Sequence, residues 1–411
     1  MNLLLPYAAP ADDRFWTEAW PAFLQQTSMP PGAPVVMDFL DAFSKKILLD
    51  PGVRGAAAFA ALAHWARRGH QQHYVRHLAA LPGRRAACGV VLNLAPANVD
   101  TLFAYAWFAS LLCGNATIVR VSSRSRPVIA PLLDILRGLL AEPRFAAVRD
   151  RTLLVSYEHD EQLTTRLSGG CQARLIWGGD ETVRAIRALP LPATAREIAF
   201  GDRFSLAAFP AAHITALEPA GLQRLAEGFC RDAFTFGQKA CASPRAVIFT
   251  GDAAACVTAA ARFWPAVQAE LRQRPDGFGE ADGITRLAAA MALSTTVPGA
   301  RVTLRPTDGT PPLVLLVPAW PAGLRDQHDG AGLFVQLDLP ALAALAPHLT
   351  ARDQTLVTAG FTPAELAAFT AHLPARAIDR IVAPGQALDF DPTAWDGHDL
   401  LSLLTREITF S

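Results

Sequence analysis

The feature that most constrains this chain is a repeated alternation between short, almost uniformly apolar runs and amphipathic segments. The run ACGVVLNLAP (87–96) precedes a helical pattern over 100–112, which is followed by the β-branched run ATIVRV (116–121) and a second helical pattern over 127–140. Apolar strands separated by amphipathic helices are typical of a parallel sheet covered by helices on both faces. The sequence therefore predicts an α/β fold.

The alternation continues through strands at 152–157, 173–177, 197–200 and 205–209, and a second series of helices and strands begins at 219. At 411 residues the chain exceeds what one hydrophobic core usually supports, so we expect two closely packed domains with a cleft between them. The expected parts are an N-terminal helical leader (1–85), a first α/β domain (86–209), a second α/β domain (210–375) and a C-terminal segment (376–411) that packs back on the first domain.

Composition excludes several classes of function. The formal net charge is +0 and no long run of Lys or Arg occurs, so no nucleic-acid partner is expected. No stretch approaches the roughly 18 to 20 apolar residues that span a bilayer. The N-terminus lacks a positively charged leading region, so we expect a cytoplasmic protein that does not span the membrane. The six cysteines form no CxxC pair or His/Cys cluster, so neither disulfides nor a metal are expected.

One cysteine has unusual neighbours. Cys241 lies in FTFGQKACASPR (234–245), a loop sequence directly before the apolar run AVIF, and neither of the glycine-rich nucleotide motifs GxGxxG and GxxxxGK[ST] occurs in the chain. A nucleophilic cysteine needs positive charge or backbone N–H groups nearby to form its thiolate, and Lys239 and Arg245 could supply that charge. The alternative is a buried thiol beside a solvated lysine.

FGQKACASPR closely resembles the nucleophile loop of the aldehyde dehydrogenase superfamily, and is most similar to that of LuxC-type acyl-CoA reductases, which share the spacing of Gln238 and Cys241. Residues 92–127 and 173–183 resemble the cofactor half of the superfamily. FGDRFS (200–205) and the tail 380–400 resemble LuxC-type proteins more specifically. The resemblance implies an aldehyde-dehydrogenase-like fold, with an NAD(P)H-binding first domain and a catalytic second domain that carries Cys241.

By this resemblance Cys241 attacks an acyl carbonyl, and the Asn98 side chain donates a hydrogen bond to the resulting oxyanion. The alternative for Asn98 is a turn residue after Pro96. The glutamate that activates water in oxidative relatives corresponds to Ala199, which fits a reductase because water would discharge the acyl-enzyme to acid. Glu197, two residues upstream, remains open as a displaced acid or base.

The loop after ATIVRV implies a cofactor preference. Where NAD-preferring relatives place a glutamate, this chain has Arg120, Ser122, Ser123 and Arg124, whose hydroxyls and guanidinium groups suit the 2′-phosphate of NADPH. The alternative is a solvated basic loop. Gly178 and Gly179, before a predicted helix, would let the cofactor pyrophosphate approach backbone N–H groups.

The resulting hypothesis is NADPH-dependent reduction of a long-chain fatty-acyl thioester, either acyl-CoA or an acyl-carrier thioester, to an aldehyde. Two alternatives stay open: an oxidative aldehyde dehydrogenase, and a non-catalytic scaffold subunit of an acyl-transfer complex. The resemblance also implies a possible acyl-protein synthetase partner and a homo-oligomer.

Overall fold

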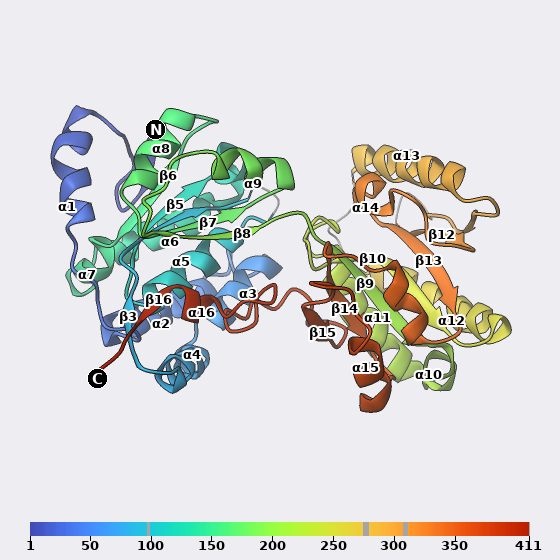
Figure 1. Ribbon diagram of the computed structural model, residues 1–411. Coiled ribbons are helices and arrows are strands. Elements are labelled where there is room, and N and C mark those ends of the chain that lie inside the picture. Colours follow the sequence, from blue (N-terminus) through green and yellow to red (C-terminus); the bar gives the residue numbers. More distant parts are fainter. Residues whose placement is uncertain (97–98, 274–278, 307–310, 411) are drawn as a thin grey trace. The chain divides into compact units, whose positions relative to one another are not determined.

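The computed structural model describes residues 1–96, 99–273, 279–306 and 311–410. They form two compact units, one made of residues 1–202 and 390–411 and the other of residues 203–389 (Figure 1). Each unit is built on a seven-stranded sheet. Both sheets are largely parallel and carry helices, which confirms the predicted α/β fold.

The first sheet has the strand order β2-β1-β6-β5-β4-β7-β8. Its strands are β1 (Asn2–Leu5), β2 (Ala9–Pro10), β4 (Val90–Leu94), β5 (Ala116–Val121), β6 (Thr152–Ser156), β7 (Ala173–Trp177) and β8 (Arg196–Phe200). The five strands from β6 to β8 in this order are parallel, and β1 pairs with β6 in the antiparallel direction. The predicted strands at 116–121 and 173–177 are thus found at those residues.

The two faces of the first sheet bury different cores because successive side chains of a strand point to opposite faces. Val91 packs in a core that includes residues of α5 and α6, whereas Val90, Leu92 and Leu94 pack in another with residues of α8 and α9. The helices of this unit are α1 (Trp20–Leu24), α2 (Pro34–Leu49), α3 (Ala57–Trp65), α4 (Arg68–Ala80), α5 (Leu102–Leu112), α6 (Arg126–Leu140), α7 (Ala146–Arg149), α8 (Glu161–Gly169), α9 (Asp180–Arg187) and α16 (Leu400–Leu403). Burial on both faces explains why these strands are apolar along their whole length.

The first ten residues form a hairpin that extends this sheet, although the sequence indicated only helices and loops there. β1 is four residues long and has no alternating pattern of its own. Its partner, β6, lies about 150 residues further along the chain, so pairing across the fold decides its structure.

The second sheet has the order β11-β12-β13-β10-β9-β14-β15. Its strands are β9 (Phe204–Pro210), β10 (Pro244–Thr250), β11 (Arg301–Leu304), β12 (Leu313–Val317), β13 (Leu333–Leu339), β14 (Asp353–Thr358) and β15 (Arg380–Val382). The accompanying helices are α10 (Ala211–Ala216), α11 (Pro219–Phe234), α12 (Ala253–Leu271), α13 (Glu280–Thr296), α14 (Leu324–Gln327) and α15 (Pro363–Thr370). Ile248 and Phe249, neighbours on β10, again lie in separate cores.

The break between the units lies at Asp202–Arg203. The run 205–209, which the sequence placed in the first domain, forms part of β9 and pairs with β10 and β14 of the second sheet. An apolar run alone does not indicate which sheet a strand joins, because its partners come from distant parts of the chain. The assignment of cofactor binding to one unit and catalysis to the other stays a prediction.

The C-terminal residues 390–411 belong to the first unit. Trp395 is buried there, with its ring 4.6 Å from that of Phe390 and 6.3 Å from that of Trp177. β16 (Thr405–Ile408) pairs with β3 (Arg84–Ala87) in a separate two-stranded ribbon. Trp395 therefore covers the core of the first unit at β7.

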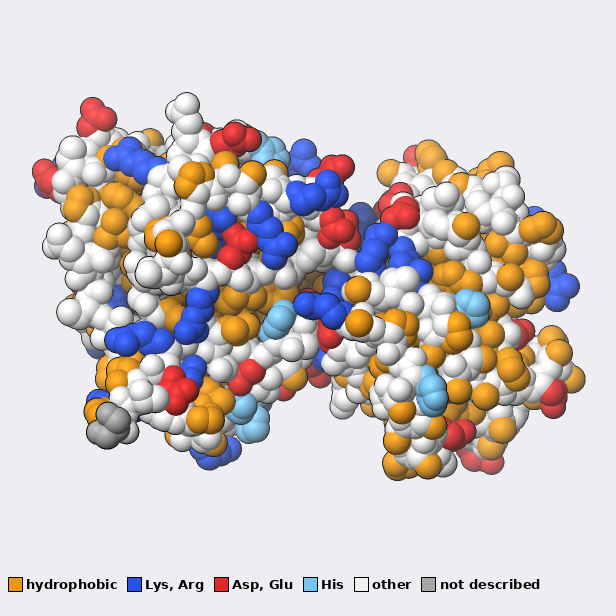
Figure 2. All heavy atoms as spheres, in the orientation of Figure 1, with side chains coloured by type: hydrophobic (Ala, Val, Ile, Leu, Met, Phe, Trp, Pro, Cys, Tyr) orange, Lys and Arg blue, Asp and Glu red, His pale blue; other side chains and the backbone are white. Residues whose placement is uncertain are grey.

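Two further observations concern the surface. Basic and acidic side chains are interspersed on the face shown in Figure 2, consistent with a formal net charge of +0. Within the described ranges, every helix is too short or too polar to cross a membrane.

Asn115 joins three segments of the first unit. Its side chain is fully buried, accepts a hydrogen bond from the Gly89 N–H (3.1 Å) and donates to the carbonyls of Ser110 (3.2 Å) and Leu404 (2.9 Å). We expect Asn115→Ala to lower the free energy of unfolding by about 2 to 4 kcal/mol in urea denaturation, since each buried polar group left without a partner costs roughly 1 to 3 kcal/mol. Asn2→Ala, at an exposed position of the same sheet, should change it by no more than about 0.5 kcal/mol. Equal effects of the two substitutions would show that the Asn115 contacts do not stabilise the fold.

Candidate functional site

Cys241 lies in the loop between α11 and β10, at the edge of the second sheet where its parallel strands begin. The flanking Ala240 and Ala242 are buried, whereas Cys241 is partly exposed. The Ser205 hydroxyl, at the start of β9, donates a hydrogen bond to the Cys241 carbonyl (2.7 Å). The Ser243 hydroxyl donates to the Asp232 carbonyl near the end of α11 (2.7 Å). The loop is thus held on both sides of the thiol.

Gln238 ties this loop to the strand beside it. Its buried amide donates to the carbonyls of Pro244 and Leu333 (both 2.9 Å) and accepts from the Gly332 N–H (2.8 Å). Gln238 has a φ of +62°, which costs a non-glycine residue on the order of 1 kcal/mol, and these three bonds offset that cost. Gly330 permits the approach, because a Cβ there would lie 2.7 Å from the Gln238 carbonyl oxygen. The Gln238–Cys241 spacing therefore has a structural reason: the glutamine anchors the turn that presents the cysteine.

The two cations expected near the thiol have described contacts elsewhere. The Lys239 ammonium lies 3.6 Å from a carboxylate oxygen of Asp282, and Arg245 donates to the His328 carbonyl (3.2 Å). Lys239 is therefore in an ion pair rather than simply solvated. Burial, aided by the Arg245 charge, lowers the pKa of His328 to about 3, so its ring is neutral at physiological pH. A neutral His328 leaves Arg245 as the cationic partner in that contact.

Asp232 holds the segment that follows the second sheet. Its buried carboxylate accepts hydrogen bonds from the N–H groups of Gly385 (2.7 Å) and Ala387 (3.0 Å). Burial raises the pKa of Asp232 to about 7 in spite of these two bonds. Since its hydrogen bonds go to backbone within the same unit, we assign Asp232 a structural role.

Cys88 is partly exposed like Cys241, and burial raises the pKa of its thiol, whereas the other four thiols are buried. Cys113, Cys171, Cys230 and Cys256 are fully buried, and burial raises the pKa of both Cys171 and Cys256 to about 11. A thiol with so high a pKa is almost entirely protonated at pH 7 and is a poor nucleophile. This supports the interpretation of the buried cysteines as packing residues.

Glu197, the alternative acid or base, is engaged in an ion-pair network on β8. One carboxylate oxygen accepts from the Arg174 Nε (2.9 Å) and the other from the Arg187 Nε (2.9 Å). The Arg174 side chain is 1% exposed and also bonds to Ser168 and to the Leu189 carbonyl. The carboxylate compensates a buried charge, which favours a structural role over proton transfer.

The first sheet offers a nucleotide-binding edge. Along the chain, β5 and β6 are added successively on one side of β4, and β7 and β8 are then added on its other side. In open parallel sheets, ligands bind beyond the carboxyl ends of the strands near such a reversal of strand order. Arg120 is the penultimate residue of β5, and the loop with Ser122, Ser123 and Arg124 follows the carboxyl end of the strand, at this edge.

The four loop residues are not equivalent. The Arg120 guanidinium donates to the Tyr157 carbonyl (3.0 Å) and lies over the Tyr157 ring. The buried Ser122 hydroxyl accepts from the Arg124 N–H (3.3 Å), while the Arg124 side chain is exposed. Ser123 donates to the carboxylate of Glu158 (2.5 Å). A hydroxyl, a carboxylate and an exposed guanidinium together fit a nucleotide ribose.

Sequence reasoning missed Glu158, although a signal was present. β5 and β6 are parallel with Val121 opposite Ser156. Ser123 and Glu158 each lie two residues beyond that pair, so they lie side by side just beyond the ends of adjacent strands. Equal offsets from the strand ends were visible in the sequence, but the register was not.

The predicted pyrophosphate position is less open than expected. Gly178 and Gly179 do precede α9, but the Gly178 N–H donates to the Phe200 carbonyl (3.1 Å). The Asp180 N–H is directed at Asp202 (3.3 Å), whose own N–H donates to the Asp180 carboxylate (3.0 Å). The two carboxylates at the start of α9 would repel a phosphate group. The observed arrangement therefore does not favour pyrophosphate binding at Gly178 and Gly179.

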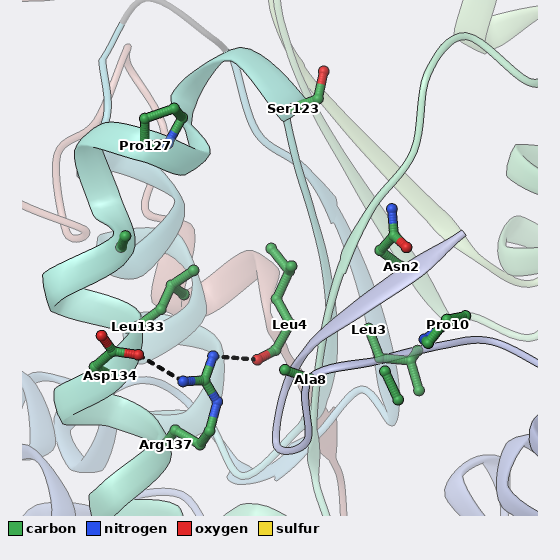
Figure 3. A pocket seen from close by; sticks show the side chains of 12 residues that line it. Asn2, Leu3, Leu4, Ala8, Pro10, Ser123, Pro127, Leu133, Asp134 and Arg137 are labelled. Atoms are coloured by element: carbon green, nitrogen blue, oxygen red, sulfur yellow. Dashed lines mark hydrogen bonds and ion pairs between the residues drawn. The ribbon is translucent and has the colours of Figure 1, made fainter.

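A cavity of about 670 Å³ lies between the N-terminal hairpin and α6 (Figure 3). Ser123 and Pro127 lie toward one end of it, and Arg137 toward the other. Arg137 pairs with Asp134 (2.6 Å) and lies within 3.5 Å of the Leu4 carbonyl, so both contacts are internal to the fold. The predicted oxyanion residue Asn98 lies outside the described residues.

The Glu197 network yields a stability prediction. Glu197→Ala should lower the free energy of unfolding by about 3 to 5 kcal/mol in urea denaturation, because it leaves the buried Arg174 charge uncompensated. Arg187→Ala removes only the ion pair between Glu197 and Arg187, whose side chain is 57% exposed. It should lower the free energy of unfolding by no more than about 1 kcal/mol. A Glu197→Ala protein of unchanged stability that has lost the expected reductase activity would instead identify Glu197 as an acid or base.

Comparison with known proteins supports the resemblance. Residues 82–280 match the family model described as acyl-CoA reductase (LuxC). No curated protein matches the chain.

Similar solved structures include three dehydrogenases. Aldehyde dehydrogenase 21 from Physcomitrella patens has 10% identity and a TM-score of 0.67, with 92% of this chain and 84% of that chain covered. The 1-pyrroline-5-carboxylate dehydrogenase from Thermus, solved with bound NAD, has 13% identity and a TM-score of 0.66, with coverage of 94% and 83%. An NAD-dependent benzaldehyde dehydrogenase from Corynebacterium glutamicum has 12% identity and a TM-score of 0.64, with coverage of 97% and 89%.

Identities this low show the fold alone, and that fold is the one expected for the superfamily. The sequence motifs, the family match and the two parallel sheets agree with one another. Residues 82–280, which include parts of both units, therefore match the LuxC acyl-CoA reductase family, within a chain that has the aldehyde dehydrogenase fold.

Proposed function

We propose that this protein reduces a long-chain fatty-acyl thioester, most simply an acyl-CoA, to the aldehyde with NADPH, through an acyl thioester on Cys241. The observation that carries the proposal is the Gln238-anchored loop, which presents a partly exposed thiol within the segment that matches the LuxC family. The buried cysteines lack this setting.

The chemistry requires two displacements at one carbon atom. The Cys241 thiolate attacks the acyl carbonyl carbon, and the tetrahedral oxyanion collapses by breaking the bond to the CoA sulfur, which leaves as a thiolate. Bound NADPH supplies a hydride for the second step. The acyl group on Cys241 is thereby reduced to a thiohemiacetal oxyanion, which expels the aldehyde and regenerates the Cys241 thiolate.

Both oxyanions need hydrogen-bond donors. We assign this role to the Asn98 side chain and the Cys241 backbone N–H; removal of one such donor typically costs about 3 to 4 kcal/mol of transition-state stabilisation. Ser205 fixes the Cys241 carbonyl, which restrains the orientation of the adjoining backbone.

The cofactor residues are assigned by position. Arg124 is the cation we assign to the 2′-phosphate, with Ser122 holding the Arg124 backbone and Arg120 bracing the loop against Tyr157. Ser123 faces the ribose. Gly178 and Gly179 contact the pyrophosphate only if Asp202 releases the Asp180 N–H.

An oxidative aldehyde dehydrogenase would use the same thiohemiacetal but needs a base to activate water. The corresponding position holds Ala199, and the nearby Glu197 is engaged by Arg174 and Arg187. Both observations favour reduction. A non-catalytic scaffold would need no partly exposed thiol, so the acylation test below separates it from an enzyme. A carrier-protein substrate, an acyl-protein synthetase partner, a homo-oligomer and a cytoplasmic location remain parts of the proposal.

Acylation of Cys241 gives the first test. Incubation with a long-chain acyl-CoA in the absence of NADPH should add the mass of one acyl group to the protein, and Cys241→Ser should remove both this adduct and aldehyde formation. A serine hydroxyl is a far weaker nucleophile than a thiolate. Intact-mass spectrometry measures the adduct.

Buried thiols provide matched controls for that test. Cys230→Ala and Cys256→Ala should cost about 1 to 2 kcal/mol of stability and leave the adduct intact. An adduct that persists in Cys241→Ser would show that another residue is acylated.

Cofactor preference gives the second test. Arg124→Ala should weaken NADPH binding by about tenfold, because one phosphate–guanidinium contact is lost, and leave NADH binding almost unchanged. Titration of each cofactor by protein fluorescence measures both dissociation constants. Equal weakening of the two cofactors would contradict the assignment of Arg124 to the 2′-phosphate.

A further inference from the structure

The contact between Ser123 and Glu158 bears on cofactor choice in a way that the Ser123 loop alone does not. Glu158 is exposed and follows the carboxyl end of β6, next to the loop that follows β5. Its carboxylate oxygen lies 2.5 Å from the Ser123 hydroxyl. In doubly wound sheets, a carboxylate that follows the second strand binds the ribose 2′-hydroxyl of NAD. Here the Ser123 loop follows the second strand, β5, and Glu158 follows the adjacent third strand, β6.

This contact changes what Ser123 can offer to a ligand. A hydroxyl carries one hydrogen atom, and here that hydrogen is directed at Glu158, so the Ser123 oxygen presents only lone pairs. A 2′-phosphate consists of acceptor oxygens and bears negative charge. Neither the Ser123 lone pairs nor the Glu158 carboxylate can donate to it, whereas both can accept from a ribose 2′-hydroxyl.

Arg120 and Arg124 do not offset the Glu158 charge to the same extent. Arg120 is held by the Tyr157 carbonyl and ring, which leaves the exposed Arg124 as the cation of this loop that has no described side-chain contact. One exposed guanidinium and one exposed carboxylate therefore follow the ends of two adjacent strands. The first favours NADPH, and the second favours NADH.

We propose that Glu158 is a specificity-determining residue that accepts a hydrogen bond from the adenosine ribose 2′-hydroxyl and thereby lets NADH bind alongside NADPH. The inference rests on the proposed function, because it requires a nicotinamide dinucleotide at this edge of the first sheet. It adds Glu158, which follows β6, to the site formed by the loop after β5, and it limits the preference for NADPH that Arg124 confers.

The test is the binding of the two cofactors to Glu158→Gln, measured by isothermal titration calorimetry without acyl substrate. Glutamine keeps the size of the side chain and removes its charge. NADPH should bind about tenfold more tightly, because the substitution removes the repulsion between the Glu158 carboxylate and the 2′-phosphate. NADH should bind equally well or more weakly, since an amide is a poorer acceptor for the 2′-hydroxyl.

Glu161→Gln is the matched control. Glu161 begins α8, is also exposed and lies three residues further along, so the substitution removes the same charge from the same edge without touching Ser123. It should leave the ratio of the NADPH and NADH dissociation constants unchanged.

Each other outcome is decisive. If Glu158→Gln changes both dissociation constants by one factor, or changes neither, Glu158 does not determine specificity, while the proposed reductase function stands. If Glu161→Gln shifts the ratio as much as Glu158→Gln does, the effect is general electrostatics and the inference fails. If neither cofactor binds to the unaltered protein, the inference and the proposed function fail together.

Discussion

The structure depends on one constraint: each unit is built on a largely parallel sheet whose strands are buried on both faces. A strand such as β4, with all five residues buried, has no side-chain position free for chemistry. Polar function must therefore lie where strands begin or end. Cys241 precedes β10, Ser123 follows β5 and Glu158 follows β6.

Arg174 shows what the same constraint costs when a charge lies within a strand. Its side chain is 1% exposed on β7, and the structure surrounds it with the Glu197 carboxylate, the Ser168 hydroxyl and the Leu189 carbonyl. A buried cation without such partners would destabilise the fold severely. Glu197, the glutamate near the position of the water-activating base in oxidative relatives, is thus engaged in ion pairs, which agrees with the proposed reductase.

The two candidate sites are held by different means. The Cys241 loop is held by side chains that donate hydrogen bonds to backbone carbonyls. Gln238 donates to β10 and β13, and Ser205 donates to Cys241. The candidate ribose site, formed by Ser123, Arg124 and Glu158, instead lies at the surface. Its opposite charges, on Arg124 and Glu158, follow the ends of adjacent strands. The first arrangement restrains the backbone that carries Cys241. The second lies at the surface, so single substitutions can change its charge without disturbing the core.

The sequence by itself determined the α/β class, most strands and helices, the aldehyde-dehydrogenase-like fold and the LuxC relationship, because apolar runs and the Cys241 loop are local patterns. It did not determine that residues 205–209 join the second sheet, that residues 2–5 form an edge strand, or that Asp202 meets the start of α9. Nor did it reveal that Glu158 meets Ser123 or that Glu197 compensates Arg174. These contacts depend on strand pairing and register between segments remote in the chain, which the folded structure alone decides.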